Sequence, residues 1–247
     1  MCWETDSTRN HLDEHHFRSR TTEDSFDTFL FRQELCKRFE LINRNMPQHL
    51  DRLHSPPCGY HIAEGLLFTK NVEGPIVECG CFKGAMTAKM SILCKAMGKE
   101  LYVFDSFQGL PHDELFNDGI NKWRKTQFSC PRNEVEAAVR KYGEIEVCHF
   151  VEGFFENTLQ DYDLKPSMVF IDVDLTTSMR TCTEHFWPRL VGPRFYSHEA
   201  RIKEYVEALL DRQWWNDKFG RNPPPHVGCG TGFPDAPALC YLKKNYN

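Results

Sequence analysis

Two short apolar segments, each ending in an acidic residue, constrain this chain more than any other feature. Residues 75–84 read Pro-Ile-Val-Glu-Cys-Gly-Cys-Phe-Lys-Gly, so Glu78 ends the first segment directly before a glycine turn. The second segment, residues 101–105, reads Leu-Tyr-Val-Phe-Asp. Glycines let the backbone approach a ligand, and an acid at the end of the next parallel strand binds ribose hydroxyls. The pair predicts a nucleotide-like cofactor at the carboxyl edge of a parallel sheet.

The spacing of the glycines narrows the choice of cofactor. A dinucleotide site needs Gly-x-Gly-x-x-Gly, which seats a pyrophosphate on a helix N-terminus. Here Gly80 and Gly84 enclose three other residues, so that pattern is absent. The turn therefore favours a cofactor without a phosphate, and S-adenosylmethionine is the common one. We expect Gly80, Phe82 and Gly84 to contact it, with Glu78 near its methionine part.

Composition excludes several other classes of protein. The 247 residues are 40% hydrophobic and 26% charged, which suits one globular domain. A net charge of −5 gives no reason to expect a nucleic-acid partner. No apolar run approaches the ~20 residues of a membrane span, and the first residues lack a signal-peptide core. We expect a cytoplasmic protein without a membrane partner.

The cysteines also indicate a cytoplasmic protein. Eleven are present, an odd number, and most lie in apolar or periodic segments. Such residues are typical of buried, reduced thiols in a cytosolic protein. Cys79 and Cys81 have no second Cys/His pair at zinc spacing, so we expect no zinc there.

Strand and helix patterns alternate after an N-terminal helical region. Residues 1–24 are polar and predict a tail, and residues 25–70 predict two helices separated by a break at Pro56-Pro57. The alternation that follows specifies a parallel sheet covered on both faces. Strands are expected at residues 76–79, 101–105, 147–151, 168–173 and 194–197. Helices are expected at residues 85–97, 134–142, 155–160, 178–190 and 200–215.

The end of the chain predicts an antiparallel edge. Two short strands, near residues 226–230 and 238–242, are joined by a turn rich in Gly and Pro. The predicted fold is therefore α/β, a Rossmann-like sheet of seven strands, mostly parallel, with a C-terminal antiparallel hairpin. We expect residues 25–247 to form this single domain. Residues 111–132 form a polar loop with little periodicity, and a loop of that length beside a cofactor is typical of a lid.

Four segments give the sequence a resemblance to the macrocin O-methyltransferase family. They lie at residues 77–84, 103–111, 151–159 and 171–178, and Trp-Pro-Arg-Leu follows at 187–190. The stretch Asp-Ser-Phe-Gln-Gly-Leu-Pro is much more specific than a glycine turn alone. The resemblance implies binding of S-adenosylmethionine, the class I methyltransferase sheet, a homo-oligomer, a small-molecule acceptor, and often a divalent metal beside the acceptor hydroxyl.

The same segments supply the remaining cofactor residues. Asp172, near the end of the fourth strand, is expected at the methionine end of the cofactor. An acid pair at a strand's carboxyl end is hard to explain by packing, because buried carboxylates without partners are unfavourable. The residues that we expect around the ribose and adenine are Asp105, Ser106, Gly153, Phe154 and Phe155.

The sequence departs from the family pattern at the expected acceptor site. Family members end the fifth strand in a paired Asp-Asp, whereas His198 and Glu199 stand here. A third acid of the family's metal site matches Asp174. Asp174, His198 and Glu199 can hold a cation, since histidine and carboxylates both ligate metals. They can equally form an acid–base set without a metal. A neutral His198 would then take the proton from the hydroxyl that is methylated, and Asp174 would assist.

We therefore expect methyl transfer from S-adenosylmethionine to an oxygen of a small natural-product or sugar-like acceptor. Two alternatives remain open. One is a metal-independent methyltransferase for nitrogen or a carboxylate, and the other is a non-catalytic cofactor-binding protein whose acceptor site has decayed. The replacement of the Asp-Asp pair keeps both alternatives open.

Overall fold

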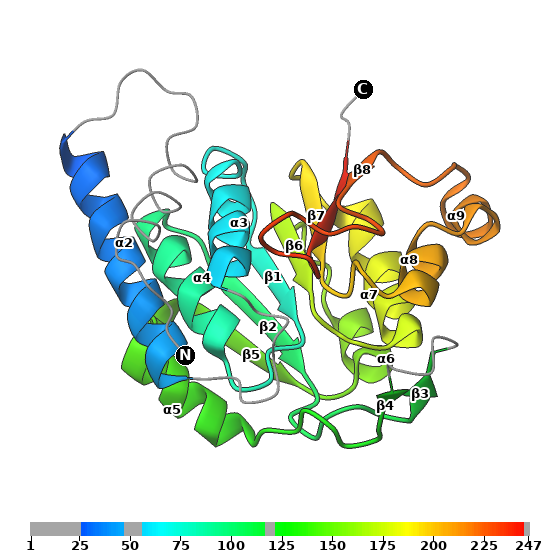
Figure 1. Ribbon diagram of the computed structural model, residues 1–247, viewed down its shortest axis with the longest axis horizontal. Coiled ribbons are helices and arrows are strands. Elements are labelled where there is room, and N and C mark those ends of the chain that lie inside the picture. The colour runs from blue at the N-terminus through cyan, green and yellow to red at the C-terminus, as the bar shows by residue number, and fades with distance from the viewer. Residues whose placement is uncertain (1–25, 47–55, 117–121, 245–247) are drawn as a thin grey trace, which may run out of the picture.

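A seven-stranded sheet runs through the middle of the computed structural model, which describes residues 26–46, 56–116 and 122–244 (Figure 1). The predicted tail at residues 1–24 lies outside the described residues. The strand order is β5-β2-β1-β6-β7-β9-β8. These strands are β1 Ile76–Cys79, β2 Leu101–Asp105, β5 Cys148–Glu152, β6 Met168–Ile171, β7 Arg194–Ser197, β8 His226–Val227 and β9 Cys240–Lys243.

The direction of the strands agrees with the prediction. β5, β2, β1, β6 and β7 are parallel to their neighbours, whereas β9 runs antiparallel to β7 and β8 antiparallel to β9. The predicted mostly parallel sheet with a C-terminal antiparallel hairpin is confirmed. Because parallel strands share one direction, the carboxyl ends of β1, β2, β6 and β7 meet at one edge of the sheet.

Helices cover both faces of this sheet (Figure 1). One layer holds α2 Phe26–Asn45, α3 Pro56–Leu67, α4 Ala85–Ala96 and α5 Arg132–Tyr142. The other layer holds α6 Phe155–Thr158, α7 Thr176–Arg189, α8 Lys203–Leu209 and α9 Arg212–Phe219. Short 3₁₀ turns occur at Ile145–Val147 and Leu159–Asp161. Among the described residues, no helix is both long and apolar enough to cross a membrane.

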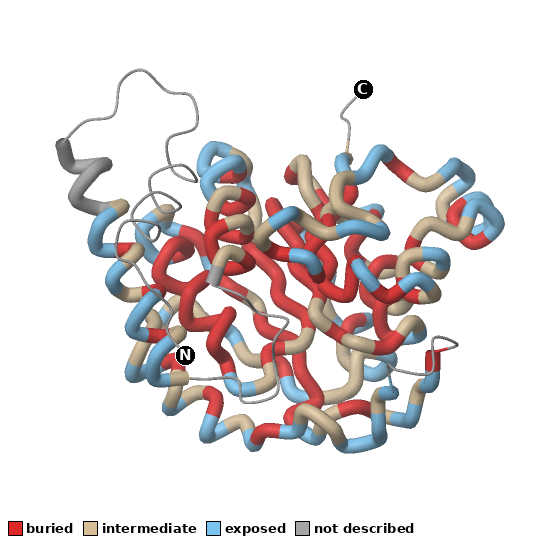
Figure 2. The backbone as a smooth tube through the Cα atoms, in the orientation of Figure 1, coloured by how far each residue is buried: buried red, intermediate tan, exposed pale blue. Residues whose placement is uncertain are grey.

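Alternation along the central strands divides the core in two. Ile76 packs into the core beneath α2 to α5, while its neighbour Val77 packs into the core beneath α7 to α9, and both are fully buried. Successive strand residues point to opposite faces, so a strand covered on both faces must be apolar throughout. The buried residues follow the central strands and the helix faces that pack on them (Figure 2).

Two helix predictions were wrong. The break expected at Pro56-Pro57 is the first turn of α3, a position where proline is tolerated because its missing N–H would have no helical partner. The single helix expected at residues 200–215 is two helices. The carboxylate of Asp211 accepts hydrogen bonds from the backbone N–H groups of Gln213 and Trp214, so it caps a new helix at that point.

Smaller differences lie at strand ends. β6 stops at Ile171 instead of residue 173, and β5 occupies 148–152 instead of 147–151. The loop expected at 111–132 contains a two-stranded antiparallel ribbon of β3 Glu114–Leu115 and β4 Lys122–Trp123. The early end of β6 matters for the site, because two acids follow it.

Candidate active site

A cavity opens at the edge where the carboxyl ends of the parallel strands meet. Residues from the loops after β1, β2, β5, β6 and β7 line it, as expected for a ligand site of a parallel sheet. The described lining does not include Glu78, Gly84 or Gly153. The expected site residues that do line the cavity are Gly80, Phe82, Asp105, Ser106, Phe154, Phe155, Asp172, Asp174, His198 and Glu199.

Close packing requires the two glycines of the first turn. Gly80 has a φ of +83°, and a Cβ there would overlap the backbone carbonyl oxygen of Asp172. Gly84 has a φ of +79° and precedes α4, where a Cβ would meet Val135 of α5 at 2.9 Å. Only glycine adopts such a backbone without strain. The turn can therefore lie tightly between β6 and α5 and leave the space above it to a ligand.

Asp105 organises two loops at once. Its Oδ2 accepts hydrogen bonds from the backbone N–H groups of Cys81 at 2.7 Å and Phe82 at 3.3 Å. Its Oδ1 accepts one from the N–H of Phe107 at 2.7 Å. Hydrogen bonds to an ionised carboxylate are stronger than neutral ones. The sequence predicted a ribose ligand here but did not reveal this second role, in which Asp105 ties the glycine turn to the loop after β2.

Glu78 is a fully buried acid with weak polar contacts among the described residues. Neither carboxylate oxygen has a hydrogen bond of good geometry, although the hydroxyl of Thr87 lies near enough to lower the pKa of Glu78 in part. Burial outweighs this contact and raises the pKa of Glu78 to about 8, and the nearby carboxylates of Asp172 and Asp105 add to the effect. The side chain is therefore mostly neutral at pH 7. A cationic ligand beside it would favour the ionised form.

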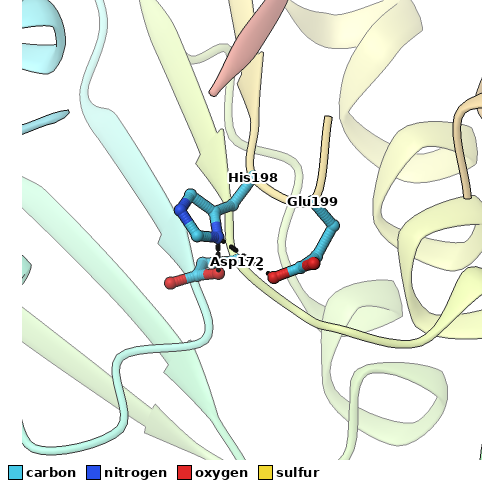
Figure 3. A group of neighbouring side chains, drawn as sticks. All are labelled: Asp172, His198 and Glu199. Carbon is cyan, nitrogen blue, oxygen red and sulfur yellow. Dashed lines mark hydrogen bonds and ion pairs between the residues drawn. The ribbon is translucent and has the colours of Figure 1, made fainter. Parts of the chain in front are cut away.

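Three side chains, two of them buried, form a charged group at the carboxyl ends of β6 and β7 (Figure 3). His198 Nδ1 lies 3.1 Å from Asp172 Oδ1 and 3.2 Å from Glu199 Oε1. His198 and Glu199 are almost completely buried, and the side chain of Asp172 is 15% exposed. The sequence predicted a group of Asp174, His198 and Glu199, whereas the structure brings His198 and Glu199 together with Asp172. We call this group the Asp172–His198–Glu199 triad.

Backbone geometry explains why Asp174 lies outside the triad. β6 ends at Ile171, so the alternation of a regular strand no longer governs the residues that follow. Asp174 has a φ of +59°, and the N–H of Leu175 donates to the carbonyl of Val173 at 2.6 Å across it. This is a tight turn in a strained backbone region, a feature that clusters at functional sites. The half-buried Asp174 thereby lines the cavity.

The surroundings of His198 favour its protonated form. Burial opposes the charge, but the Asp172 carboxylate, together with contacts to Cys58 and Glu199, raises the pKa of His198 well above its ordinary value. A protonated ring has no lone pair with which to accept a proton. These surroundings count against a neutral His198, and its role as general base stays a prediction. Sequence reasoning also missed Cys58, a buried residue of α3 that it did not single out.

The donor atoms of the triad also fit a divalent cation. One oxygen of each acid and a ring nitrogen all lie within 4.8 Å of one another. One imidazole and two carboxylates suit a borderline ion such as Mn²⁺ or Zn²⁺ better than Mg²⁺, which prefers oxygen ligands and water. The residues that would hold such an ion are Asp172, His198 and Glu199, so Asp172 takes the place expected for Asp174.

The segment after β2 covers part of the cavity. Leu110, Pro111 and Phe128 line it, although the sequence marked none of them as site residues. Both carboxylate oxygens of Glu114 accept from the backbone N–H of Thr176 at 3.2 Å, at the first turn of α7. This anchors the segment beside the turn that carries Asp174. The sequence did offer one signal for this part of the lining, because Leu110 and Pro111 end the most specific of the segments that resemble the family.

Comparisons with solved structures identify the fold. The O-methyltransferase NovP matches with a TM-score of 0.61 and 19% identity, over 76% of this chain and 80% of its own. The calicheamicin methyltransferase CalS11 matches with a TM-score of 0.60 and 19% identity, over 90% and 94%. The O-methyltransferase TomG from Streptomyces achromogenes, involved in tomaymycin synthesis and solved with S-adenosylmethionine, matches with a TM-score of 0.53 and 13% identity, over 98% and 100%. At these identities the likeness establishes the fold.

The sheet order, the glycine turn and the cavity define a class I methyltransferase fold, the class that uses S-adenosylmethionine. No curated protein matches the chain in sequence. The family model described as macrocin-O-methyltransferase (TylF) matches residues 61–195, more than half of the chain. The chain therefore belongs to the macrocin O-methyltransferase family of S-adenosylmethionine-dependent methyltransferases.

Proposed function

We propose that the chain methylates a hydroxyl oxygen of a small, sugar-like or other natural-product acceptor. Family membership supports O-methyl transfer. CalS11, whose apo structure matches this chain with a TM-score of 0.52, is described as a TDP-rhamnose 3'-O-methyltransferase, so this fold can present a sugar hydroxyl to the cofactor. The sulfonium already activates the methyl group. The main task of the protein is to hold donor and acceptor in line at ~3–3.5 Å.

In the proposed complex the cofactor lies along the carboxyl edge of the sheet. The ribose lies beside Asp105 and Ser106, and Phe154 and Phe155 flank the adenine, in keeping with their place in the cavity lining. The methionine part extends over the turn between Gly80 and Gly84. Its ammonium group would then approach Glu78 and give that buried carboxyl a charged partner.

We assign to Asp174 the role of general base, which takes the proton that the acceptor hydroxyl loses. The observation that carries this assignment is the pairing within the triad, where the ring nitrogen of His198 contacts Asp172 and Glu199. Both acids are engaged with this one ring, whereas Asp174 reaches the cavity from a separate strained turn. A carboxylate within reach of a hydroxyl can act as general base. When bound by the triad, a divalent ion would lower the pKa of the acceptor hydroxyl.

The test is transfer of a labelled methyl group from S-adenosylmethionine to a panel of hydroxylated sugars and phenols. Asp174→Asn should lower the rate by about 10²–10⁴-fold and leave the affinity for S-adenosylhomocysteine nearly unchanged. Asparagine also tolerates the left-handed backbone of this position, so the turn should persist.

Asp163→Asn serves as the matched control for this test. It changes an 84% exposed acid that pairs with Arg189 and does not line the cavity, and it should have no effect on the rate. If Asp174→Asn turns over an accepted substrate at the parental rate, Asp174 is not the general base.

A further inference from the structure

The segment that carries His198 and Glu199 is bonded to two other stretches of the chain. The N–H of His198 donates to the carbonyl of Ile171 at 2.9 Å, at the end of β6, and residues 228–239 hold Ala200, which follows Glu199. The N–H of Ala200 donates to the carbonyl of Ala238 at 2.8 Å, and the N–H of Gly230 donates to the carbonyl of Ala200 at 2.9 Å. Residues 228–239, which connect β8 to β9, therefore bracket Ala200 on both sides. Glu199 itself has a φ of +68°, a conformation that persists only when the surroundings enforce it.

Residues 228–239 form turns rather than a helix or a long strand. The N–H of Gly232 donates to the carbonyl of Gly228 at 2.6 Å, and Phe233 and Ala236 exchange two backbone hydrogen bonds. Turns of this kind need side-chain contacts to stay in one place. This segment brackets Ala200, so its order bears on the position of the neighbouring Glu199.

His61 of α3 supplies such contacts. Its Nε2 lies 2.8 Å from Asp235 Oδ1, and its ring stacks on Phe233 with 4.4 Å between centroids and 16° between planes. The side chains of His61 and Asp235 are only 13% and 25% exposed, so water weakens this pair less than it would an open one.

α3 reaches the triad along a second, direct route. Cys58 precedes His61 by three residues, which places both side chains on one face of the helix. Cys58 contacts His198 itself. In Figure 3 the second ring nitrogen of His198 points away from Asp172 and Glu199, which leaves that side of the ring to other partners. One helix face therefore supports the triad directly through Cys58 and indirectly through His61.

We propose that His61 is a positioning residue for methyl transfer. Through Asp235 and Phe233 it fixes residues 228–239 against α3, and these hold Glu199 in its strained backbone conformation beside His198. Its effect on turnover rests on the proposed function, whereas its effect on the order of the segment does not. The two effects can therefore be measured separately.

Hydrogen exchange followed by mass spectrometry tests the ordering without any substrate. In His61→Ala, amides of residues 198–202 and 228–239 should exchange about tenfold faster or more, while β1 and β6 stay protected. His149→Ala is the matched control. It removes a similar pair, with His149 Nε2 2.6 Å from Glu100 Oε2, and a similar stack on Tyr102, but at the edge strand β5. It should leave residues 198–202 unchanged.

Asp235→Asn provides a second variant if His61→Ala does not fold, since it keeps the size of the side chain. Unchanged exchange at residues 198–202 in the folded variants would overturn the proposal. With an accepted substrate, His61→Ala should lower kcat about 10-fold or more at an unchanged Kd for S-adenosylhomocysteine, and His61→Phe, which keeps the ring stack, should recover part of the rate. Faster exchange in a chain that methylates nothing would support the positioning role and count against the proposed function.

Discussion

The buried carboxyl of Glu78 leads to a prediction about stability and pH. The pKa of Glu78 is about 8 in the folded chain, against 4.5 for an ordinary glutamate, and burial is the main cause. The folded state therefore holds this proton more tightly than the unfolded state. Binding of this proton to Glu78 therefore stabilises the folded state. The stabilisation is fully present below about pH 4.5 and is lost as the pH rises through about 8.

The size of the effect follows from that difference. Each pH unit between the two pKa values lowers the free energy of unfolding by about 1.4 kcal/mol, on the order of 5 kcal/mol in all. Glu78→Gln keeps the shape of the side chain and cannot ionise. Its free energy of unfolding relative to the parent should rise by about 3 kcal/mol between about pH 5.5 and pH 7.5.

Urea unfolding of both proteins at a series of pH values measures this difference. Glu207→Gln is the control, because the side chain of Glu207 is 63% exposed and its removal should give a difference that does not change with pH. A flat difference for Glu78→Gln as well would mean that Glu78 is ionised in the folded chain at neutral pH. The reasoning about its burial would then be wrong.

Three further results are expected. Asp105→Ala should weaken binding of S-adenosylhomocysteine by about 1–3 kcal/mol, since three backbone N–H groups lose their acceptor and the turn loosens; an unchanged dissociation constant in calorimetry would contradict this. Cys79 and Cys81 should resist alkylation in the native chain, because burial raises the pKa of both thiols well above the ordinary range, and mass spectrometry should find them unmodified and without stoichiometric zinc. Asp211→Ala should lower the melting temperature by roughly 2–4 °C by removing the cap of α9, and an unchanged melting curve would show that the cap contributes little.

The sequence predicts the sheet well because local signals coincide with tertiary structure there. The bounds expected for β1, β2 and β7 are those observed, since each is a short apolar run closed by a turn or an acid. A strand that is buried on both faces can be predicted from its own apolar sequence, without knowledge of the strands beside it. The antiparallel hairpin at the end of the chain was similarly marked by its glycines and prolines.

The details of the site depend on features that no local pattern encodes. The expectation that Asp174 would join His198 and Glu199 assumed a strand that continues to residue 173, but β6 ends two residues earlier. The pairing of His198 with Asp172 then follows from where two neighbouring strands end. The protonation of His198 depends on that pairing, and therefore could not be inferred from the residue type alone.

The role of Asp105 shows a similar limit. Its position at the end of β2 marked it as a site residue, and it does line the cavity. Its three hydrogen bonds to backbone N–H groups come from residues that are close only in the folded chain. Sequence therefore located the residue and predicted one role, whereas the structure added another.

Calorimetric titration of S-adenosylhomocysteine into the purified chain tests the central claim most directly. The account predicts one binding site per chain with nearly the same affinity in the presence and absence of chelator, because the proposed cofactor contacts at Asp105, Ser106 and Glu78 need no metal. Asp105→Ala should weaken that binding within the same experiment. Absence of binding under both conditions would contradict the cofactor site, and binding that vanishes completely in chelator would contradict its independence from the triad.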